Sequence, residues 1–213
     1  MIGALAKTTL NRVHGSMVFG RRVEALSAAL AEALPAGPLQ VLDLGCGDGQ
    51  IALGVMRLRP EITISGVDVM LRPLTHIPVT LYDGCDLPFA DGSFDYVTIV
   101  DVLHHTDHPQ DVLKEAARVA RQGVAVKDHL REGLLAGPTL RMMDWVGNRG
   151  HDVRLPYNYL DTAQWDAAIA HAGLERDAVN ERLGLYGAPL NWWFERKLHF
   201  VTTLRPSQSG QVR

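Results

Sequence analysis

Between Leu39 and Leu130 short apolar runs alternate with amphipathic stretches, and this alternation limits the fold more than any other feature of the sequence. Strand, helix and strand in repeated succession predict βαβ crossovers and a parallel sheet covered on both faces. The predicted strands are nearly continuous in Val, Ile and Leu, which is typical of strands buried on both sides. They are Val41–Leu44, Ile62–Val67, Val97–Val100 and Val124–Val126. The sequence therefore predicts an α/β protein with a doubly wound, mostly parallel sheet.

Weaker patterns lie on either side of this region. Apolar residues at helical spacing predict a helix over Arg21–Leu34, which prolines and a glycine then end. A later helix is expected at Asp161–Ala172, because its first residue and Gln164 stand at the positions of a capping box. Two more strands are expected around Arg176–Leu183 and Leu198–Leu204. The intervening stretch of about 30 residues, Leu130–Leu160, is long for a connector and predicts a functional cover.

Length and composition exclude several classes of protein. A chain of 213 residues can bury one core without disulfides or a structural metal, and its 46% hydrophobic content fits neither disorder nor a coiled coil. The formal net charge of −3 gives no overall attraction to nucleic acid or to an anionic membrane, so a small-molecule partner is expected. The oligomeric state is left open.

The compartment is inferred from what the sequence lacks. No uncharged apolar run approaches about 18 residues, and the first residues lack the apolar stretch of a signal peptide. The cysteines, Cys46 and Cys85, are not spaced as a metal-ligand pair. These observations predict a reduced, cytoplasmic protein with no membrane insertion.

The strongest local signal is the turn that follows the first predicted strand, Asp43-Leu44-Gly45-Cys46-Gly47-Asp48-Gly49. Glycines at alternate positions allow positive φ and close approach of a ligand, and the next helix offers free N–H groups at its start. A dinucleotide fingerprint needs glycine where Gln50 stands, and a P-loop needs a Gly-Lys-Ser/Thr ending that is absent. A plain tight turn, with its glycines serving only packing, is the alternative.

The pattern Asp43-x-Gly45-x-Gly47-x-Gly49 resembles motif I of the class I S-adenosylmethionine-dependent methyltransferases, and three later segments agree in order and distance. Asp68 ends the second strand where the family places an acid that holds both ribose hydroxyls. The run from Asp83 to Asp95 is similar to the family's D-A-x-x-L-P-F…D-x-S-F-D segment, whose first Asp accepts a hydrogen bond from adenine. Val100–His105 resembles the end of the fourth strand. The resemblance covers about Leu39–Asp128 and is nearest to the small-molecule branch called methyltransferase type 11.

This resemblance implies a Rossmann-like sheet of seven strands with an antiparallel last strand, and S-adenosyl-L-methionine as cofactor. The cofactor-binding residues that it implies are Asp43, Gly45, Cys46, Gly47, Gly49, Asp68, Val69, Met70, Asp83, Gly84 and Asp101. Carboxylates at strand ends suit hydroxyl donors and a positively charged sulfonium ligand. Val69 and Met70 either form an apolar wall for adenine or belong to the core. The family usually has a helix before Val79, but two prolines leave no room for it here.

Methyl transfer from a sulfonium is an in-line displacement, so aligning the acceptor with the methyl group can supply most of the acceleration. A base helps where the acceptor carries a proton. The candidate catalytic residues are His104 and His105, at the end of the fourth strand, and His129. Adjacent histidines on a strand point to opposite faces, so no metal site is expected, and structural or surface roles remain alternatives for each histidine.

The resemblance implies a single methyltransferase domain whose parts are an N-terminal helical segment (1–37), a cofactor-binding half (38–129), a cap insertion for the acceptor (130–160), a C-terminal helix and strands (161–205), and a flexible tail (206–213). The cap mixes aromatic, methionine and polar side chains, which is typical of a pocket for a small, partly apolar acceptor. These are Arg141, Met142, Met143, Asp144, Trp145, Asn148, His151, Tyr157 and Tyr159. An amphipathic helix over Leu134–Val146 that packs on the sheet is the plainer alternative.

The function that follows is S-adenosylmethionine-dependent methyl transfer to a small, partly apolar or aromatic organic acceptor, on oxygen, nitrogen or carbon. A nicotinamide-dependent oxidoreductase is disfavoured by Gln50 and by the acidic strand ends, while a non-catalytic S-adenosylmethionine-binding regulator stays open. Nucleic-acid methylation is disfavoured, since no Asn/Asp-Pro-Pro-Tyr/Phe segment follows the fourth strand. Trp192-Trp193-Phe194 has three alternatives: to line a pocket, to cover a sheet edge or to touch a lipid.

Overall fold

The computed structural model describes residues 20–147 and 156–207. The sequence-based interpretations of the first residues, of Asn148 and His151 in the cap, and of the tail from residue 208 onward lie outside this part of the chain. Within it, none of the helices has the length and apolar character needed to cross a bilayer.

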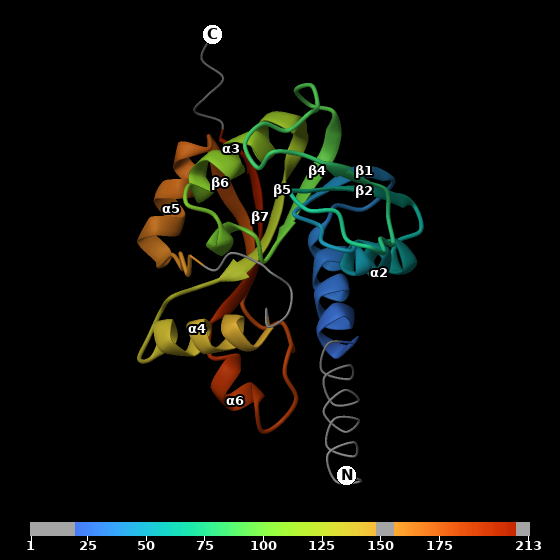
Figure 1. The fold of residues 1–213 in the computed structure, drawn as a ribbon. Coiled ribbons are helices and arrows are strands. Elements are labelled where there is room, and N and C mark those ends of the chain that lie inside the picture. The colour runs from blue at the N-terminus through green and yellow to red at the C-terminus, as the bar shows by residue number, and fades with distance from the viewer. Residues whose placement is uncertain (1–19, 148–155, 208–213) are drawn as a thin grey trace, which may run out of the picture.

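A seven-stranded sheet forms the centre of the molecule, with the strand order β3-β2-β1-β4-β5-β7-β6 (Figure 1). The strands are β1 (Leu39–Leu44), β2 (Ile62–Asp68), β3 (Val79–Leu81), β4 (Phe94–Val100), β5 (Ala120–His129), β6 (Leu174–Asn180) and β7 (His199–Pro206). Strands β1 to β5 pair in parallel, and β7 runs antiparallel to both β5 and β6. The predicted Rossmann-like sheet with an antiparallel last strand is confirmed.

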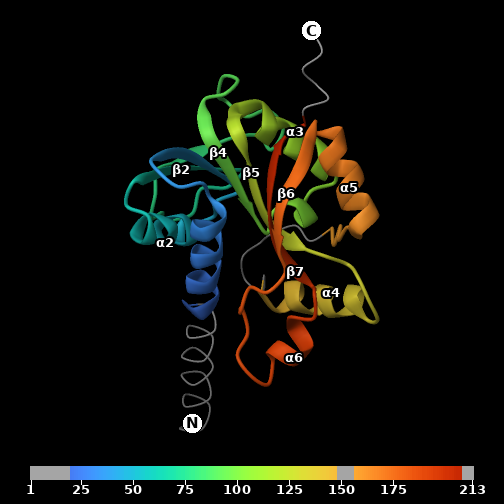
Figure 2. The ribbon, with the colours of Figure 1, turned by 180° about the vertical axis from the view of Figure 1, so that it is seen from behind.

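Helices cover both faces of the sheet, as Figure 2 shows from behind. They are the N-terminal helix, which includes residues 20–33, and α2 (Gln50–Leu58), α3 (Pro109–Val119), α4 (Ala136–Gly147), α5 (Thr162–His171) and α6 (Asn191–Phe194). The capping box predicted at Asp161 is present, since its side chain and that of Gln164 each accept from the other's backbone N–H. The segment between Met70 and Val79 contains no helix, as its prolines indicated.

The core has one layer on each face of the sheet because neighbouring residues of a strand point to opposite sides. On one face α3 and α5 pack against a layer that includes Leu42 and Leu44. On the other, the N-terminal helix and α2 pack against Val41 and its neighbours. A third, small core, made by Leu140, Tyr159 and two further residues, attaches α4 beyond the carboxyl end of β5.

The fold creates one preferred place for a ligand. From β1 the chain passes to β2 on one side, and β4 lies on the other side of β1. In open α/β sheets, ligands bind outside the carboxyl ends of the strands at such a reversal of strand order. The turn after β1 lies at this point.

Candidate functional site

The glycines of the turn after β1 have different surroundings. All three have positive φ, at 71° for Gly45, 58° for Gly47 and 79° for Gly49. A Cβ atom on Gly45 would lie 2.4 Å from Val102 Cγ2, and one on Gly49 would lie 2.5 Å from Ile77 Cγ1. A Cβ atom on Gly47 would meet no described atom within 4 Å. Packing therefore accounts for two of the glycines, whereas Gly47 faces open space.

Asp68, the last residue of β2, is held by two backbone hydrogen bonds, one of them from this turn. Its Oδ2 accepts from the Gly47 N–H at 2.8 Å, and its Oδ1 accepts from the Met70 N–H at 2.9 Å. Each carboxylate oxygen can accept a second hydrogen bond, so the residue retains acceptor capacity beside the open space at Gly47. This arrangement fits a ligand that brings two neighbouring hydroxyl groups, as the predicted ribose contact requires.

Asp43 supports the turn from inside. It is buried and accepts a hydrogen bond from Thr98 Oγ1 at 2.8 Å. Burial raises the pKa of Asp43 to about 7, against the opposing effect of the Thr98 hydrogen bond. Burial also raises the pKa of the Cys46 thiol to about 12, so the thiol is protonated at neutral pH, and its predicted cofactor contact stays a prediction.

Gly66 in β2 packs against the turn after β1, and sequence reasoning missed it. A Cβ atom there would lie 2.3 Å from Cys46 Sγ, so only glycine leaves room for the turn to close over β2. An isolated glycine inside a strand often marks such a close approach, and that signal was present in the sequence.

The residues predicted to hold adenine lie on a more exposed surface. Val69 and Met70 are 59% and 37% exposed, so the alternative that they belong to the core is wrong. A Cβ atom on Gly84 would lie 3.2 Å from Val69 Cγ1, which places the two predicted residues side by side. Asp83 Oδ1 accepts from the N–H groups of Cys85 and Asp86, and these bonds lower the pKa of Asp83. Their contact with a cofactor stays a prediction.

Asp101 directly follows β4 and has a left-handed backbone, with φ of 56°. Its Oδ2 accepts from Arg22 of the N-terminal helix, and its Oδ1 accepts from the fully buried Lys127 of β5. Burial alone would raise the pKa of Asp101, but the Lys127 and Arg22 cations hold it well below the usual value. Since both oxygens are engaged by side chains of the protein itself, the predicted cofactor contact would have to share them.

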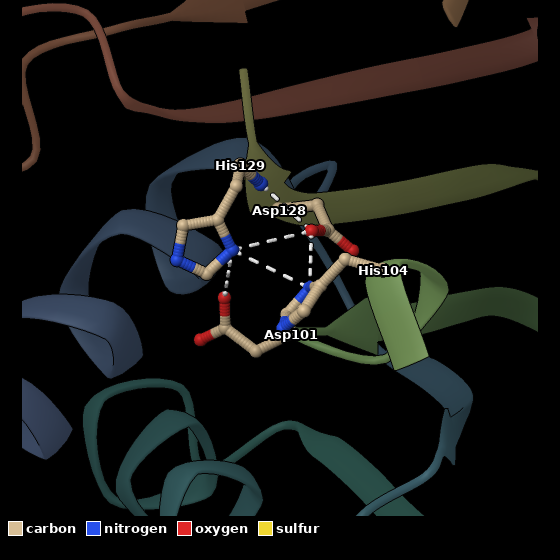
Figure 3. A group of neighbouring side chains, drawn as sticks. All are labelled: Asp101, His104, Asp128 and His129. Carbon is tan, nitrogen blue, oxygen red and sulfur yellow. Dashed lines mark hydrogen bonds and ion pairs between the residues drawn. The ribbon is translucent and has the colours of Figure 1, made fainter. Parts of the chain in front are cut away.

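His104 is buried between two carboxylates, and Figure 3 shows it facing Asp128. Its Nδ1 lies 2.6 Å from Asp128 Oδ1, and its Nε2 lies 3.5 Å from Asp144 Oδ1. Burial lowers the pKa of His104, but the attraction of Asp128 and the contact with Asp144 raise it to about 10. His104 is therefore an imidazolium at neutral pH, and this state argues against its predicted role as a base.

His129, the last residue of β5, is uncharged at neutral pH, in contrast to His104. Its Nδ1 lies 3.4 Å from His104 Nδ1 and 3.5 Å from Asp101 Oδ1. Burial, together with the Lys127 and His104 cations, lowers the pKa of His129 to about 4. The ring is neutral at pH 7, but it is only 4% exposed.

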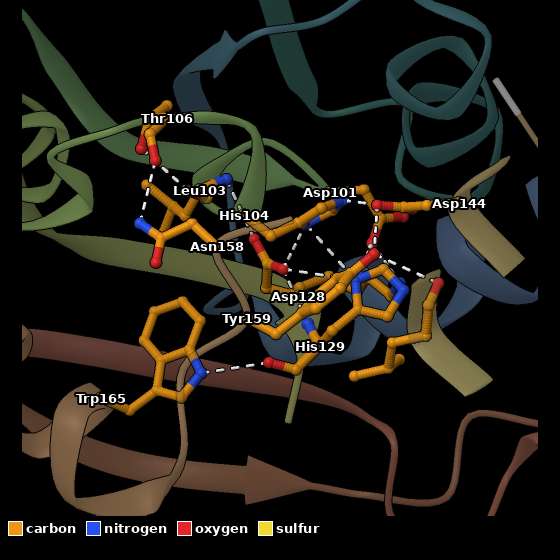
Figure 4. A network of polar contacts seen from close by, with 12 residues as sticks. Asp101, Leu103, His104, Thr106, Asp128, His129, Asp144, Asn158, Tyr159 and Trp165 are labelled. Atoms are coloured by element: carbon orange, nitrogen blue, oxygen red, sulfur yellow. Dashed lines mark hydrogen bonds and ion pairs between the residues drawn. The ribbon is translucent and has the colours of Figure 1, made fainter. Parts of the chain in front are cut away.

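The cap closes over this pair of histidines. Tyr159 donates its hydroxyl proton toward Asp144 Oδ2 and Leu140 O, at 2.5 Å and 3.1 Å. The Trp165 indole N–H of α5 donates to the backbone oxygen of His129 at 3.1 Å. Figure 4 shows how these contacts surround His104 and Asp128 with residues from distant parts of the sequence.

His105 differs from both other candidates because it is only half-buried. His104 and His105 belong to a 3₁₀-helix, Leu103–His105, and not to a strand, so the expectation that they point to opposite faces is wrong. Their ring centroids are 4.0 Å apart. Burial and the neighbouring His104 cation lower the pKa of His105. Its Nδ1 has no hydrogen-bond partner among the described residues.

His199 is a second residue of the site that sequence reasoning missed. It begins β7 directly opposite His129 in the β5–β7 register, and its ring centroid lies 4.9 Å from that of His129. It is 3% exposed, and neither ring nitrogen has a hydrogen-bond partner among the described residues. Burial lowers its pKa well below the ordinary value. The register between two antiparallel strands was not readable from the sequence.

Four of these side chains could also surround a metal ion, since one ligand atom from each lies within 4.8 Å of the others. They are Asp101, His104, Asp128 and His129. The cations already present weigh against this, because Lys127 and Arg22 hold the oxygens of Asp101. The charges of the network also balance without a metal. The carboxylates are Asp101, Asp128 and Asp144, and the cations are Arg22, Lys127 and the His104 imidazolium. The prediction of no metal stays a prediction.

Comparison with known proteins matches this geometry to a family. Residues 42–126 match the model described as "Methyltransferase domain". The 27-O-demethylrifamycin SV methyltransferase of Amycolatopsis mediterranei is 31% identical over 97 residues, which are 39% of this chain and 35% of that protein. The demethylmenaquinone methyltransferase of Thermotoga maritima is 30% identical over 120 residues, 53% of this chain and 51% of that protein. The chain thus spans about half, or less, of the length of these curated relatives.

A solved structure confirms the fold across most of the chain. The structure titled as the [4+2]-cyclase SpnF has a TM-score of 0.62 and 19% identity, and the match covers 86% of this chain and 81% of that one. Because that title names a cyclase, the shared fold by itself does not define the reaction. The matched residues, the relatives and this fold together support a class I S-adenosylmethionine-dependent methyltransferase, with S-adenosylmethionine as the methyl donor.

Proposed function

We propose that the protein transfers a methyl group from S-adenosylmethionine to a small, partly apolar or aromatic organic acceptor. The observation that carries the proposal is the pairing of two sites at the carboxyl ends of one sheet. Open space at Gly47 lies beside the Asp68 carboxylate, and a buried polar network containing His104 and Asp128 lies at the ends of β4 and β5. The first suits the cofactor, and the second suits an acceptor.

In this proposal the cofactor supplies a methyl group on a positively charged sulfur, ready for in-line displacement. Asp68 and the turn at Gly47 hold the ribose, while the cap and the ends of β4, β5 and β7 hold the acceptor and exclude water. Alignment in such a site can supply effective molarities of about 10⁵ M or more.

His105 takes the proton of an acceptor hydroxyl or amine as the acceptor's lone pair forms its bond to the methyl carbon and the carbon–sulfur bond breaks. Its pKa is lowered and its ring is less buried than those of His104 and His129, although its unpartnered Nδ1 is itself a buried atom. Burial and the His104 cation together keep it neutral. A general base in this position typically contributes about 10² to 10⁴ in rate.

A regulator that binds the cofactor without catalysis is the second candidate. Such a protein has no need for a network of three carboxylates and three cations that are buried or partly buried, and burying ions costs several kcal/mol each before pairing. Networks of this kind cluster at functional sites, which supports an enzyme.

The test is a methyl-transfer assay with isotope-labelled S-adenosylmethionine and a panel of phenols, amines and activated carbon acids, preceded by calorimetry of cofactor binding. Cofactor binding with transfer of label to one class supports the proposal and identifies the atom that is methylated. Cofactor binding without transfer to any cell-extract component supports the regulator instead. Absence of cofactor binding by the folded chain contradicts both.

A further inference from the structure

The end of the molecule formed by α4 and α6 has an apolar outer surface, called here the cap-end surface. Both views place α6 against α4, beyond the carboxyl ends of the parallel strands. A hydrogen bond from Arg196, two residues after α6, to Thr139 Oγ1 of α4 also joins this end. More than half of the exposed large hydrophobic side chains of the described residues belong to this end: Leu134, Leu135, Met142, Trp145, Val146, Leu190, Trp192 and Trp193.

The tryptophans of α6 do not serve the core. This helix spans only four residues and contributes no buried side chain. Trp192 is 84% exposed and Trp193 is 41% exposed. Exposing such rings to water is unfavourable by about 25 cal/mol for each Å² of apolar surface, so a contact that covers them would be stabilised accordingly. Large exposed apolar patches on soluble domains mark interaction sites.

One of these rings has a cation over its face, and α4 and the segment after α6 supply two more cations. The Arg196 guanidinium lies over the Trp193 ring, 4.6 Å from its centroid, and the Arg141 guanidinium lies 5.6 Å from the centroid of Tyr157. The Lys197 side chain is 76% exposed, and its Nζ lies 3.5 Å from Oε2 of the partly exposed Glu181. Tryptophan rings at the headgroup level, with Arg and Lys reaching anionic phosphates, are typical of a surface that lies on a lipid bilayer.

We propose that the cap-end surface docks on the interfacial region of an anionic lipid bilayer, with Trp192 and Trp193 as the inserted side chains. The formal net charge of −3 gives the whole chain no attraction to such a membrane, so the contact depends on this local combination of aromatic rings and cations. Only Glu195 to Leu198 separate α6 from His199 in the acceptor region. Docking therefore brings the acceptor end of the sheet against the bilayer.

The test mixes the full chain, without cofactor or acceptor, with vesicles of phosphatidylcholine alone or with added phosphatidylglycerol, and floats them on a density gradient. Wild-type protein is expected to float with the anionic vesicles, and its tryptophan emission is expected to be quenched by brominated acyl chains. The double variant Trp192→Ser/Trp193→Ser is expected to lose at least about tenfold in vesicle affinity. Folding is not at risk, because α6 contributes no buried side chain.

The matched control is Leu58→Ser, at the end of α2, where the side chain is 56% exposed and outside the cap-end surface. It is expected to float as the wild type does. Three outcomes overturn the proposal: no flotation of the wild type, equal flotation of the double variant, or light scattering that shows a dimer which the double variant dissociates. The last result would assign the surface to a second copy of the chain. None of these outcomes bears on methyl transfer, so this proposal and the proposed function can fail separately.

Discussion

The Gly47 N–H donates to Asp68 Oδ2 across 2.8 Å, and this bond joins the tip of the turn after β1 to the end of β2. The donor belongs to the glycine whose missing side chain leaves open space, and the acceptor is the carboxylate predicted to hold the ribose. One hydrogen bond thus sets both the shape of the turn and the orientation of the acid. The two residues can be tested separately, because one acts through its backbone and the other through its side chain.

Gly47→Val is expected to abolish binding of S-adenosylmethionine, since the β-branched side chain fills the open space at the turn. The positive φ of this residue adds a strain of about 1–2 kcal/mol to the folded state. Gly173→Val is the matched control, because Gly173 has φ of 70° and open surroundings but lies in the loop before β6. Both variants should lose comparable stability in chemical denaturation, while calorimetry should find binding lost only in Gly47→Val. Equal cofactor affinity in the two folded variants would remove the turn from the site.

Asp68→Ala is expected to weaken cofactor binding by about 1.5 to 3 kcal/mol, roughly 10- to 100-fold, as for a hydrogen bond to a charged group. A 2′-deoxy analogue of the cofactor should bind the wild type more weakly but lose little further affinity in the variant. Calorimetry of the wild type and the variant, each with the cofactor and with the 2′-deoxy analogue, measures the coupling between Asp68 and the ribose 2′-hydroxyl. If the two losses add in full, Asp68 does not contact the ribose.

His104 makes the stability of the fold depend on pH. Because its pKa in the folded protein is raised from 6.5 to about 10, its contribution is complete below pH 6.5 and is lost as the pH rises through 10. We expect the free energy of unfolding of the wild type to fall over this window, and His104→Gln to flatten that dependence. Denaturant titrations at a series of pH values measure both slopes. Parallel slopes for the two proteins would mean that His104 is not an imidazolium.

His105→Gln is expected to lower kcat by about 10² or more while changing KM less, because it removes a proton acceptor without removing a cofactor contact. Cofactor affinity should stay within about threefold of the wild type, which is under about 0.7 kcal/mol. Since the pKa of His105 is lowered, wild-type activity should persist below pH 6.5. A KM effect alone would make His105 a binding residue, and His129 the next candidate.

The sequence predicted the sheet and the turn because their signals are local. Apolar runs such as Val41–Leu44 need only neighbouring residues to be recognised, and Gly45, Gly47 and Gly49 owe their spacing to a single turn. Asp161 and Gln164 likewise form a cap within one helical turn, and the structure has it.

The polar network was only partly predictable because its contacts are not local. Asp101 takes a left-handed conformation, which is uncommon for a residue other than glycine, and this turn carries His104 off the strand on which it was expected. Arg22, the ion-pair partner of Asp101, lies 79 positions away from it along the chain. His199 reaches the site only through the antiparallel register of β7 with β5. None of these relationships has a signature in a short window of sequence.

The ion pair between Arg22 and Asp101 also has an evolutionary consequence. Replacing Asp101 by a neutral residue would leave Lys127 as a fully buried cation without its carboxylate, at a cost of about 3–5 kcal/mol. A single such replacement would be purged before a second one could compensate for it. Relatives that share this arrangement should therefore keep or lose these three charges as a set, and the amino-terminal helix that carries Arg22 should be inherited together with the end of β4 rather than exchanged independently.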